Sequence, residues 1–511
     1  MFPGNFVQST PDKPAVIRPA TGESITYREL DERSTQLARY FRSVGAKPGD
    51  TSLSSRTTIS GRRGVLGSVE IRPLHHRGEL ASHGFGGCLH RRRLRGDNSG
   101  GVGAGVRSSS VGREADSTRA APIGVRRRLE GFDDYEEAVD AQSTAPLDSQ
   151  PRGADMLYSS GTTGRPKGIK GDLPEGEVNT TMDPYTAVFA PMYGFDSDTV
   201  YLCPAPVYHA APLRFCGVIN SVGGTVILMD AFEAETALEL IGKYAVTHSQ
   251  WVPTMFVRML KLPKETRDRY DVSTVKVAIH AAAPCPPEVK TAMIDWWGPV
   301  IYEYYASTEG SGATFINSEQ ALSHPGSVGR DGVMGIVHIC DDAGRDLPVG
   351  EIGTVFWERE TLPFRYHNDP EKTAAAQHPD HPTWTTSGDI GYIDSERFLY
   401  LTDRAAFTII SGGVNIYPQE SENILTLHPK VFDVAVIGVP DEEMGEQVKA
   451  VVQLAEGIEP GAHVAEELLE YVRSQVAHFK APRSIDFADE LPRTATGKLV
   501  KHKLRSQYVS N

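Results

Sequence analysis

Short apolar segments alternate with amphipathic segments between residues 199 and 305, and this alternation restricts the possible folds more than any other feature of the sequence. Helical periodicity appears at Ala234–Tyr244 and Pro287–Trp297. The strand-like segments around these helices are Thr199–Cys203, Thr225–Met229, Val246–Gln250, Val275–His280 and Val300–Tyr305. Strands that are separated by helices pair in parallel and need helices on both faces of the sheet. The pattern therefore predicts an α/β fold.

The segments on either side extend this α/β domain. A strand-like segment at Ile25–Tyr27 leads into an amphipathic helix at Tyr27–Val44. From Gly326 to about Tyr400 the pattern changes to short strands and turns, which predicts a smaller β-rich subdomain. Its strands are expected at Gly335–Ile339, Gly353–Trp357, Ile390–Ile393 and Phe398–Leu401. We expect this large N-terminal domain to span residues 1–402.

A second, small α+β domain is predicted over residues 403–511. Its boundary falls near Thr402–Ala406, and about a hundred residues are enough for an independent domain. The expected elements are strands at Val434–Val439, Val448–Leu454 and Ser484–Phe487 and a helix at Ala465–Val476. The stretch Leu491–Arg505 is basic and rich in turn-forming residues.

Composition excludes several classes of protein. A chain of 511 residues with 40% hydrophobic and 23% charged residues is typical of globular proteins with two or more domains. Its net charge of -14 attracts neither nucleic acid nor an anionic membrane, so any anion site must be built locally. Residues 1–14 lack the features of a signal peptide, and no run has the length of a membrane span, which predicts a cytoplasmic protein without an integral membrane segment. The five cysteines form no C-x-x-C pair, which favours buried free thiols.

The stretch from Thr51 to about Ala121 departs from this pattern. It is rich in Arg, Gly, Ser and His, contains no lysine and shows neither helical nor strand periodicity. Three interpretations are open: a disordered basic insertion, a nucleic-acid-binding arm, or a segment translated in a shifted frame. The shifted frame is favoured because codons for Leu66–Gly96 can be chosen that, read one base later, encode alternating helix-like and strand-like segments. The coding DNA across residues 50–125 would decide between them.

The stretch Ala154–Lys170, ADMLYSSGTTGRPKGIK, has the composition of a phosphate-binding loop. Glycines at 161 and 164 allow turns that aim several backbone N–H groups into one concavity. Hydroxyl groups and one lysine would add to these backbone groups. The candidate phosphate-binding residues are Ser159, Ser160, Gly161, Thr162, Thr163, Gly164 and Lys167. This is not the Walker pattern, because Lys167 is followed by glycine rather than by Ser or Thr. A flexible surface loop is the alternative interpretation.

Four further stretches carry groups suited to nucleotide chemistry. The segment EYYASTEG at Glu303–Gly310 ends a strand, where open parallel sheets bind ligands. The segment TSGD at Thr386–Asp389 places a carboxylate at a turn. Asp403-Arg404 precedes IISGGVNIYPQE at Ile409–Glu420, and TATGK at Thr494–Lys498 carries a lysine beside a glycine. Each alone fits an ordinary cap, turn, ion pair or solvated lysine, but their common order and spacing indicate one site.

With these motifs in this order, the sequence closely resembles the adenylate-forming superfamily of acyl-CoA synthetases, aryl-CoA ligases, luciferase-like enzymes and peptide-synthetase adenylation domains. The resemblance covers residues 1–50 and roughly 124–511. It rests on the motifs YSSGTTGRPKG, YYASTEG, TSGD, TDR with SGGVNIYPQE, and PRTATGK. It implies a large N-terminal domain and a mobile C-terminal domain, with ATP and a carboxylate bound at their junction.

The resemblance implies a role for each matching residue. Ser159–Lys167 would hold the β- and γ-phosphates of ATP, and Thr308 would approach the α-phosphate. Glu309 would hold Mg²⁺, which prefers hard carboxylate oxygens. The remaining nucleotide contacts are expected from Tyr305, Ala282, Ala283 and Pro284 at adenine and from Asp389 and Arg404 at the ribose.

Lys498 matches the catalytic lysine of adenylation in this superfamily. The substrate carboxylate is ionised at pH 7 and needs no general base. Its attack on the α-phosphorus instead needs compensation of the developing negative charge, which Lys498 and Mg²⁺ would supply. Pyrophosphate would leave and acyl-AMP would remain.

The segment Ser411-Gly412-Gly413 resembles the CoA-ligase form of the family. There the C-terminal domain rotates after adenylation, and the absent side chains let the pantetheine arm of CoA pass close to the backbone. The chain departs from the family pattern at the hinge, where Ala406-Phe407 replaces a lysine followed by an acid. It departs also at Ala306, where glycine is commoner, and throughout residues 51–121.

The acyl group is the least specified part of the prediction. The segment Val207–Pro212 matches the family's segment beside the acyl pocket, where His209 would close the pocket, sense the carboxylate or serve only the structure. Trp251 and Ala281–Ala283 would form bulky and small walls. We expect an AMP-forming acyl-CoA synthetase that uses ATP, Mg²⁺, CoA and a fatty or other medium-to-large hydrophobic acid. The alternatives are an enzyme that loads a carrier protein's phosphopantetheine and an inactive, frame-disrupted family member.

Overall fold

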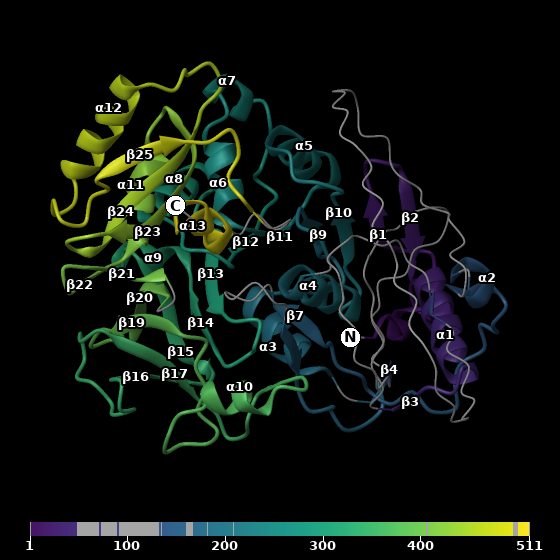
Figure 1. The fold of residues 1–511 in the computed structure, drawn as a ribbon. Helices are drawn as coiled ribbons and strands as arrows, with labels where there is room; N and C mark the ends of the chain where they lie inside the picture. Colours follow the sequence, from purple (N-terminus) through teal and green to yellow (C-terminus); the bar gives the residue numbers. More distant parts are fainter. Residues whose placement is uncertain are drawn as a thin grey trace, which may run out of the picture. The chain divides into compact units, whose positions relative to one another are not determined.

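The computed structural model describes residues 2–48, 71–72, 89–90, 132–133, 135–159, 167–180, 182–207, 209–404, 407–493 and 499–509. The chain divides into two compact units, Arg28–Ser149 and Met1–Tyr27 with Gln150–Asn511. Each unit is described by itself below, with the element labels of Figure 1. No helix within the described ranges combines the length and the apolar character needed to cross a bilayer.

The smaller unit is built around the amphipathic helix α1 (Tyr27–Ser43), which packs its apolar side on α2 (Tyr135–Asp140). Leu37, Tyr40 and Phe41 of α1 meet Val139 of α2 in a small core. The nearly buried Arg33 side chain forms ion pairs with Glu136 and Asp140. The other described elements are the strands β3 (Lys47–Pro48), β4 (Ile71–Arg72), β5 (Leu89–His90) and β6 (Phe132–Asp133). The interpretations of residues 51–121 fall almost entirely outside the described residues.

A 13-stranded mixed sheet organises the larger unit, in the order β16-β17-β19-β20-β15-β14-β13-β12-β11-β9-β10-β1-β2. In this order, the neighbouring strands β13, β12, β11, β9, β10 and β1 pair in parallel. The edge strand β2 pairs antiparallel with β1. Their bounds are β1 (Pro14–Arg18), β2 (Glu23–Thr26), β9 (Val200–Cys203), β10 (Thr225–Leu228), β11 (His248–Trp251), β12 (Val277–His280) and β13 (Ile301–Ala306). The predicted parallel α/β architecture is thereby confirmed.

The rest of the sheet is antiparallel and continues from β13 without a break. Its strands are β14 (Ala313–Ile316), β15 (Ser327–Met334), β16 (Ile336–Cys340), β17 (Gly353–Glu358), β19 (Asp389–Ile393) and β20 (Phe398–Arg404). The short strands predicted between residues 326 and 400 are present. They extend the main sheet because β15 pairs with both β14 and β20.

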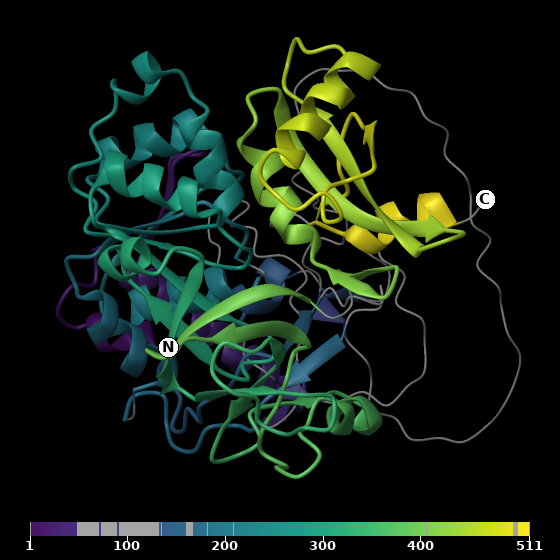
Figure 2. The same ribbon diagram turned by 90° about the vertical axis from the view of Figure 1, so that its left-hand side faces the viewer.

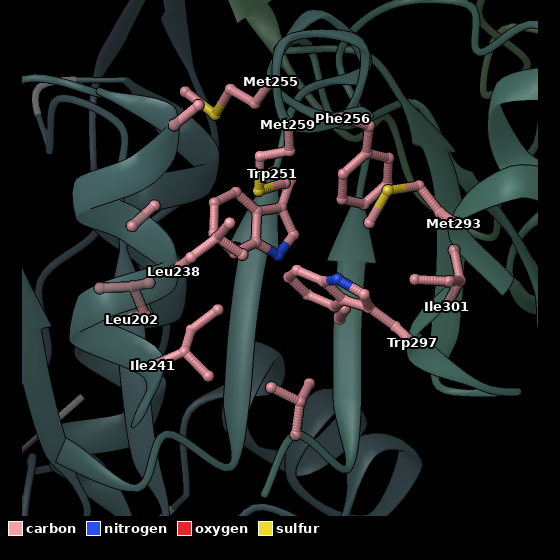
Figure 3. Packing of buried hydrophobic residues seen from close by; sticks show 14 of the residues in the cluster. Leu202, Leu238, Ile241, Trp251, Met255, Phe256, Met259, Met293, Trp297 and Ile301 are labelled. Carbon is pink, nitrogen blue, oxygen red and sulfur yellow. The ribbon is translucent and has the colours of Figure 1, made fainter. Parts of the chain in front are cut away.

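Helices cover the parallel strands, which have almost no exposed residue in β9 to β12. Helix α4 packs on β9 and β10, and α8 packs on β13. Up to residue 402, the described helices of this unit, besides the short 3-10 helix at Pro3–Phe6, are α3 (Pro184–Tyr193), α4 (Ala210–Ser221), α5 (Ala234–Tyr244), α6 (Pro253–Leu260), α7 (Lys264–Arg267), α8 (Pro287–Trp297), α9 (Ser318–Ser323) and α10 (Pro370–Ala375). Figure 3 shows the core between α5, α6, α8 and the sheet, with Trp251 at its centre.

A separate three-stranded sheet has the order β18-β8-β7. Strands β7 (Leu157–Ser159) and β8 (Lys167–Lys170) form a hairpin whose connection is the predicted phosphate loop, and β18 (Arg365–Tyr366) pairs with β8. The strand predicted before the loop is therefore present. Residues 160–166 of the loop itself lie outside the described residues.

The C-terminal domain has its own α+β core (Figure 2, yellow-green). The long hairpin of β23 (Val431–Asp441) and β24 (Gly445–Leu454) pairs with β21 (Ile409–Ser411) and β25 (Ser484–Phe487), and β22 (Val414–Ile416) lies at the edge. Its helices are α11 (Pro418–Leu427), α12 (Ala462–Arg473) and α13 (Lys501–Val509). The domain boundary near residue 402 remains a prediction.

Several helices appear where the sequence analysis predicted none, and α3, α4 and α13 are examples. The cap of α3 is Asp183, whose carboxylate accepts from two backbone N–H groups, but the body of the helix does not segregate apolar from polar residues. Helix α4 occupies the segment expected to line an acyl pocket. Helix α13 begins within the stretch interpreted as basic and turn-rich, where the basic residues around the buried Leu504 concealed an apolar position. The described cysteines, 203, 216, 285 and 340, are free and buried as predicted, and Cys88 lies outside the described residues.

Candidate active site

Two predicted site residues, Tyr305 near the carboxyl end of β13 and Asp389 at the start of β19, contact each other through their side chains. The Tyr305 hydroxyl donates a hydrogen bond of 2.6 Å to Oδ2 of Asp389, although 84 residues separate them in the sequence. The Ser387 hydroxyl donates to the same oxygen, also at 2.6 Å. Asp389 is almost fully buried. A carboxylate that accepts hydrogen bonds from two hydroxyl groups is held in one orientation toward a polar ligand.

An aromatic wall supports Tyr305 from the antiparallel part of the sheet. The Trp357 ring of β17 lies 6.1 Å from the Tyr305 ring, and Trp357 is itself buried. Gly312 permits this packing, because a Cβ atom there would lie 2.0 Å from the indole ring. The aromatic surface expected beside adenine is therefore a supported pair of rings rather than a single tyrosine.

The segment Ala282-Ala283-Pro284 follows β12, the strand next to β13. Ala282 has a φ of 76°, a left-handed conformation that alanine adopts only at a cost. The side chains of Ala282 and Pro284 are exposed, so this turn presents a small apolar surface at the carboxyl edge of the sheet. That location agrees with the predicted adenine contact.

Thr308 and Glu309 lie in the turn that ends β13, where Gly310 adopts a φ of 70°. The hydroxyl of the neighbouring Ser307 is buried and has no hydrogen-bond partner in the described part of the structure. Such a group is costly unless a ligand or water completes it, so the turn has an unused donor beside both predicted residues. Ser307 lies within the predicted segment EYYASTEG, but the sequence analysis assigned it no role of its own.

Glu309 is linked to the phosphate hairpin through Tyr366 of β18. The Tyr366 hydroxyl donates to Oε1 of Glu309 at 2.9 Å. The ammonium group of Lys167, the first residue of β8, lies 5.2 Å from the centre of the Tyr366 ring. The structure thus brings the predicted phosphate lysine and the predicted metal carboxylate to the same tyrosine.

The two residues predicted for the acyl group lie in different surroundings. His209 is the N-cap residue of α4 and is partly buried. Trp251 is only 1% exposed and donates its indole N–H to the Ser249 hydroxyl at 2.8 Å. The Trp251 ring packs on Phe256 and Trp297 (Figure 3), which are contacts of a core residue. Its contact with an acyl group remains a prediction.

Two family models match this chain. The model for the AMP-binding enzyme matches residues 5–53 and 113–362, and the model for the AMP-binding enzyme C-terminal domain matches residues 420–498. The chain belongs to the AMP-binding enzyme family. Within that adenylate-forming superfamily it is an acid–thiol ligase of the acyl-CoA synthetase group.

Known proteins similar to this AMP-binding enzyme activate different acids. Feruloyl-CoA synthase of an Amycolatopsis species is 30% identical over 95% of this chain and 94% of its own length. A long-chain-fatty-acid–CoA ligase of Mycobacterium tuberculosis is 34% identical over 69% of this chain and 67% of its own. The solved structure of o-succinylbenzoate coenzyme A synthetase from Bacillus subtilis, in complex with ATP and magnesium ion, is 26% identical with a TM-score of 0.60, covering 73% of this chain and 74% of that one.

The family match of this AMP-binding enzyme is interrupted between residues 54 and 112. This interval lies inside the stretch 51–121, in which the sequence showed neither helical nor strand periodicity. The interruption agrees with the missing family pattern there, and all three interpretations of the stretch remain open.

The segment Ser411-Gly412-Gly413 of the enzyme forms the turn between β21 and β22. Gly412 and Gly413 have φ values of 57° and 79°, which side chains rarely adopt. A Cβ atom on Gly412 would also lie 2.4 Å from the Cε atom of Met444. Both glycines are therefore needed for the turn itself, independently of any ligand that passes the backbone.

Several predicted residues of the enzyme lie outside what the structure describes. These are Ser160, Gly161, Thr162, Thr163 and Gly164 of the phosphate loop and Lys498. The backbones of Ser159 and Arg404 are described but their side chains are not, and the register pairs Arg404 with Asp389 across β19 and β20. Their roles remain predictions.

Acidification tests the state of His209 in this enzyme. Burial lowers the pKa of His209 to about 4, so the imidazole is neutral at pH 7. The imidazole of His209 binds a proton near pH 6.5 in the unfolded chain but only near pH 4 in the folded chain. The stability that the neutral ring contributes is therefore complete above about pH 6.5 and is lost as the pH falls toward 4. The change His209→Gln should therefore reduce the acid loss of unfolding free energy by about 1–2 kcal/mol, after allowance for the partly exposed ring.

The measurement is equilibrium denaturation at pH 7 and pH 4.5, with the change at the exposed His463 to Gln as the matched control. Burial also lowers the pKa values of His248 and His280. These two residues contribute the same decrease in unfolding free energy at low pH in every variant. If the unfolding free energy of His209→Gln falls between pH 7 and pH 4.5 as much as that of the unmodified protein, the buried, neutral state of this ring is contradicted.

Proposed function

We propose that this enzyme activates a carboxylic acid with ATP, releases pyrophosphate to form acyl-AMP, and then transfers the acyl group to CoA. The carrying observation is the hydrogen bond of 2.6 Å from Tyr305 to Asp389, beside the link from Glu309 through Tyr366 to Lys167. These contacts involve residues of three motifs that are distant in the sequence, namely those that contain Lys167, Tyr305 with Glu309, and Asp389. The family membership supplies the reaction class, and the solved o-succinylbenzoate enzyme supports ATP as the nucleotide.

The nucleotide roles follow from the kind of group at each position. Asp389 would accept hydrogen bonds from the ribose hydroxyls, because Tyr305 and Ser387 hold its carboxylate in place. Tyr305, supported by Trp357, would pack on adenine together with Ala282-Ala283-Pro284. Lys167 would pair with the outer phosphates, and Thr308 would donate to the α-phosphate.

The residues present fit a magnesium ion. Glu309 presents a carboxylate that is partly buried, and the neighbouring Ser307 has a buried hydroxyl without a described partner. Hard oxygen ligands of this kind, together with phosphate oxygens, suit Mg²⁺. When bound, the ion would neutralise charge on the phosphates.

The proposed reaction has two steps. An oxygen of the substrate carboxylate attacks the α-phosphorus, and the bond from that phosphorus to the pyrophosphate oxygen breaks with its electron pair leaving on pyrophosphate. The sulfur of CoA then attacks the acyl carbon, loses its proton, and AMP leaves. Lys498 would stabilise the charge of the first step, and Ser411-Gly412-Gly413 would face the thiol in the second.

The acid that we propose is a fatty or other medium-to-large hydrophobic acid. Buried aromatic rings pack around Phe215 of α4, six residues after His209. Phe215 of α4 stacks on Phe189 at 5.0 Å and on Tyr304 at 5.9 Å. Such surroundings favour an apolar acyl group. The similarity to feruloyl-CoA synthase over nearly the whole chain makes an aryl-propenoic acid the second candidate.

A product assay tests the proposal. The protein is incubated with ATP, Mg²⁺, CoA and single acids, namely medium-chain and long-chain fatty acids and ferulate, and both pyrophosphate and acyl-CoA are measured. We expect pyrophosphate and acyl-CoA in equal amounts with at least one hydrophobic acid. Acyl-AMP without thioester would favour a carrier-protein acceptor instead. Absence of pyrophosphate with every acid would support the inactive family member and contradict the proposal.

A further inference from the structure

Tyr366 lies between two groups that come from distant parts of the chain. Its hydroxyl donates to Oε1 of Glu309 at 2.9 Å, and its ring carries the Lys167 ammonium group 5.2 Å from the ring centre. The side chain is 7% exposed. The phenol thus contacts a carboxylate through its hydroxyl group and a cation through the face of its ring, and both interactions are favourable.

The tyrosine is held rigidly in this position. Its backbone pairs with Ile169 across β18 and β8, and its N–H donates to the Thr373 hydroxyl at 3.0 Å. The ring meets Phe364 edge to face, with 5.1 Å between the ring centres. Ile169, Phe364, Tyr366 and Ala376 form one buried cluster. A side chain that is fixed by backbone pairing and by packing orients its partners better than one on a loop.

The same packing attaches the phosphate hairpin to β18. Lys167 begins β8, and the next residue, Gly168, accepts a hydrogen bond from the His367 N–H at 2.8 Å. A Cβ atom on Gly168 would lie 2.7 Å from the Met156 side chain and 3.1 Å from Cβ of His367. The exit of the phosphate loop is therefore packed tightly against the strand that carries Tyr366.

We propose that Tyr366 is a positioning residue that couples metal binding at Glu309 to phosphate binding at Lys167. The phenol hydroxyl occupies Oε1 and holds the carboxylate in place, so the second oxygen of Glu309 would hold a divalent cation. The ring holds the Lys167 ammonium group, which would pair with the phosphates of the same nucleotide. The inference rests on the proposed function, because that proposal supplies the nucleotide and the metal ion.

Three single variants separate the two contacts of the phenol. Tyr366→Phe removes the hydroxyl and keeps the ring, whereas Tyr366→Leu removes both. Tyr270→Phe is the matched control, since the Tyr270 hydroxyl donates to Oε1 of Glu235 at 2.8 Å, outside every motif of the site. The probes are ATP and Mn²⁺: ATP binding is measured by calorimetry with EDTA, and Mn²⁺ binding to the ATP complex by electron paramagnetic resonance.

The expected results differ for each variant. Tyr366→Phe should weaken Mn²⁺ binding about 10-fold, the effect of losing one hydrogen bond to a charged group, with the metal-free affinity for ATP unchanged. Tyr366→Leu should also lower the metal-free affinity for ATP about 3–10-fold, because the cation–π contact is lost. Tyr270→Phe should match the unmodified protein in both measurements.

A second background keeps the inference testable if the leucine variant does not fold. In Glu309→Gln, which lacks the charged acceptor, adding Tyr366→Phe should weaken Mn²⁺ binding no further. Equal Mn²⁺ affinities of Tyr366→Phe and Tyr270→Phe would overturn the inference, as would independent effects of the two changes. If the unmodified protein binds no ATP, the proposed function itself fails, which is a different outcome.

Discussion

Replacing Lys498 with alanine is expected to lower the rate of acyl-AMP formation at least about 10²–10³-fold, the usual effect of removing one group that stabilises transition-state charge. Thioester formation from supplied acyl-AMP should continue, because in the proposed reaction the C-terminal domain rotates after adenylation and withdraws Lys498 from the site. The two half-reactions are measured separately, the first by pyrophosphate release and the second by acyl-CoA formation.

The structure fixes both ends of the segment that carries Lys498. Arg493 forms an ion pair with Asp433 of β23, and its backbone bridges to Leu499 just before α13. An alanine between these two anchors should therefore leave the domain folded. Lys503→Ala is the matched control, because this exposed lysine of α13 carries the same charge. Equal loss of both half-reactions in Lys498→Ala would refute the assigned role.

Replacing Trp251 with alanine is expected to lower the free energy of unfolding by about 3–5 kcal/mol, since the change leaves a large cavity in the core of the main sheet. The ring has almost no exposure and is surrounded by the side chains of α5, α6 and α8 (Figure 3). Equilibrium denaturation followed by circular dichroism measures the effect on the transition of this domain.

Two comparisons separate a core role of Trp251 from a role in the acyl pocket. Trp296→Ala, on the same helix as the core residue Trp297, should cost much less because that ring is only partly buried. Trp251→Phe keeps most of the apolar volume and should leave the preference among acids unchanged. A changed acid preference with full stability in Trp251→Phe would instead place Trp251 at the substrate.

Local patterns predicted the parallel part of the fold well. Helices α5 and α8 have the predicted bounds, because α5 begins after the capping carboxylate of Glu233 and α8 begins at a proline. Of the two buried strands between them, β12 is a short, mainly apolar run, whereas β11 contains His248, Ser249 and Gln250 and is buried in spite of its polar sequence. Helix α3 was missed because its apolar residues surround the axis, so periodicity gave no signal.

The candidate site was predicted in its motif residues and missed in the residues that support them. Tyr305 and Asp389 were found by family motifs, and their contact agrees with a shared ligand. Tyr366 and Trp357 belong to stretches without a distinctive pattern. Their importance comes from contacts across the fold, such as the 57 residues between Tyr366 and Glu309, and no local pattern encodes such pairings.

The continuity of the main sheet has a consequence for the order of folding. Tyr305 ends the last parallel strand, whereas Asp389 lies on a strand that reaches β15 only through β20. Pairing of Ser327 with Tyr400 closes a long loop, and such closures are slow because the chain loses entropy before contacts compensate. During synthesis, the parallel half emerges before this pairing can form. We therefore expect the contact between Tyr305 and Asp389 to form late in folding.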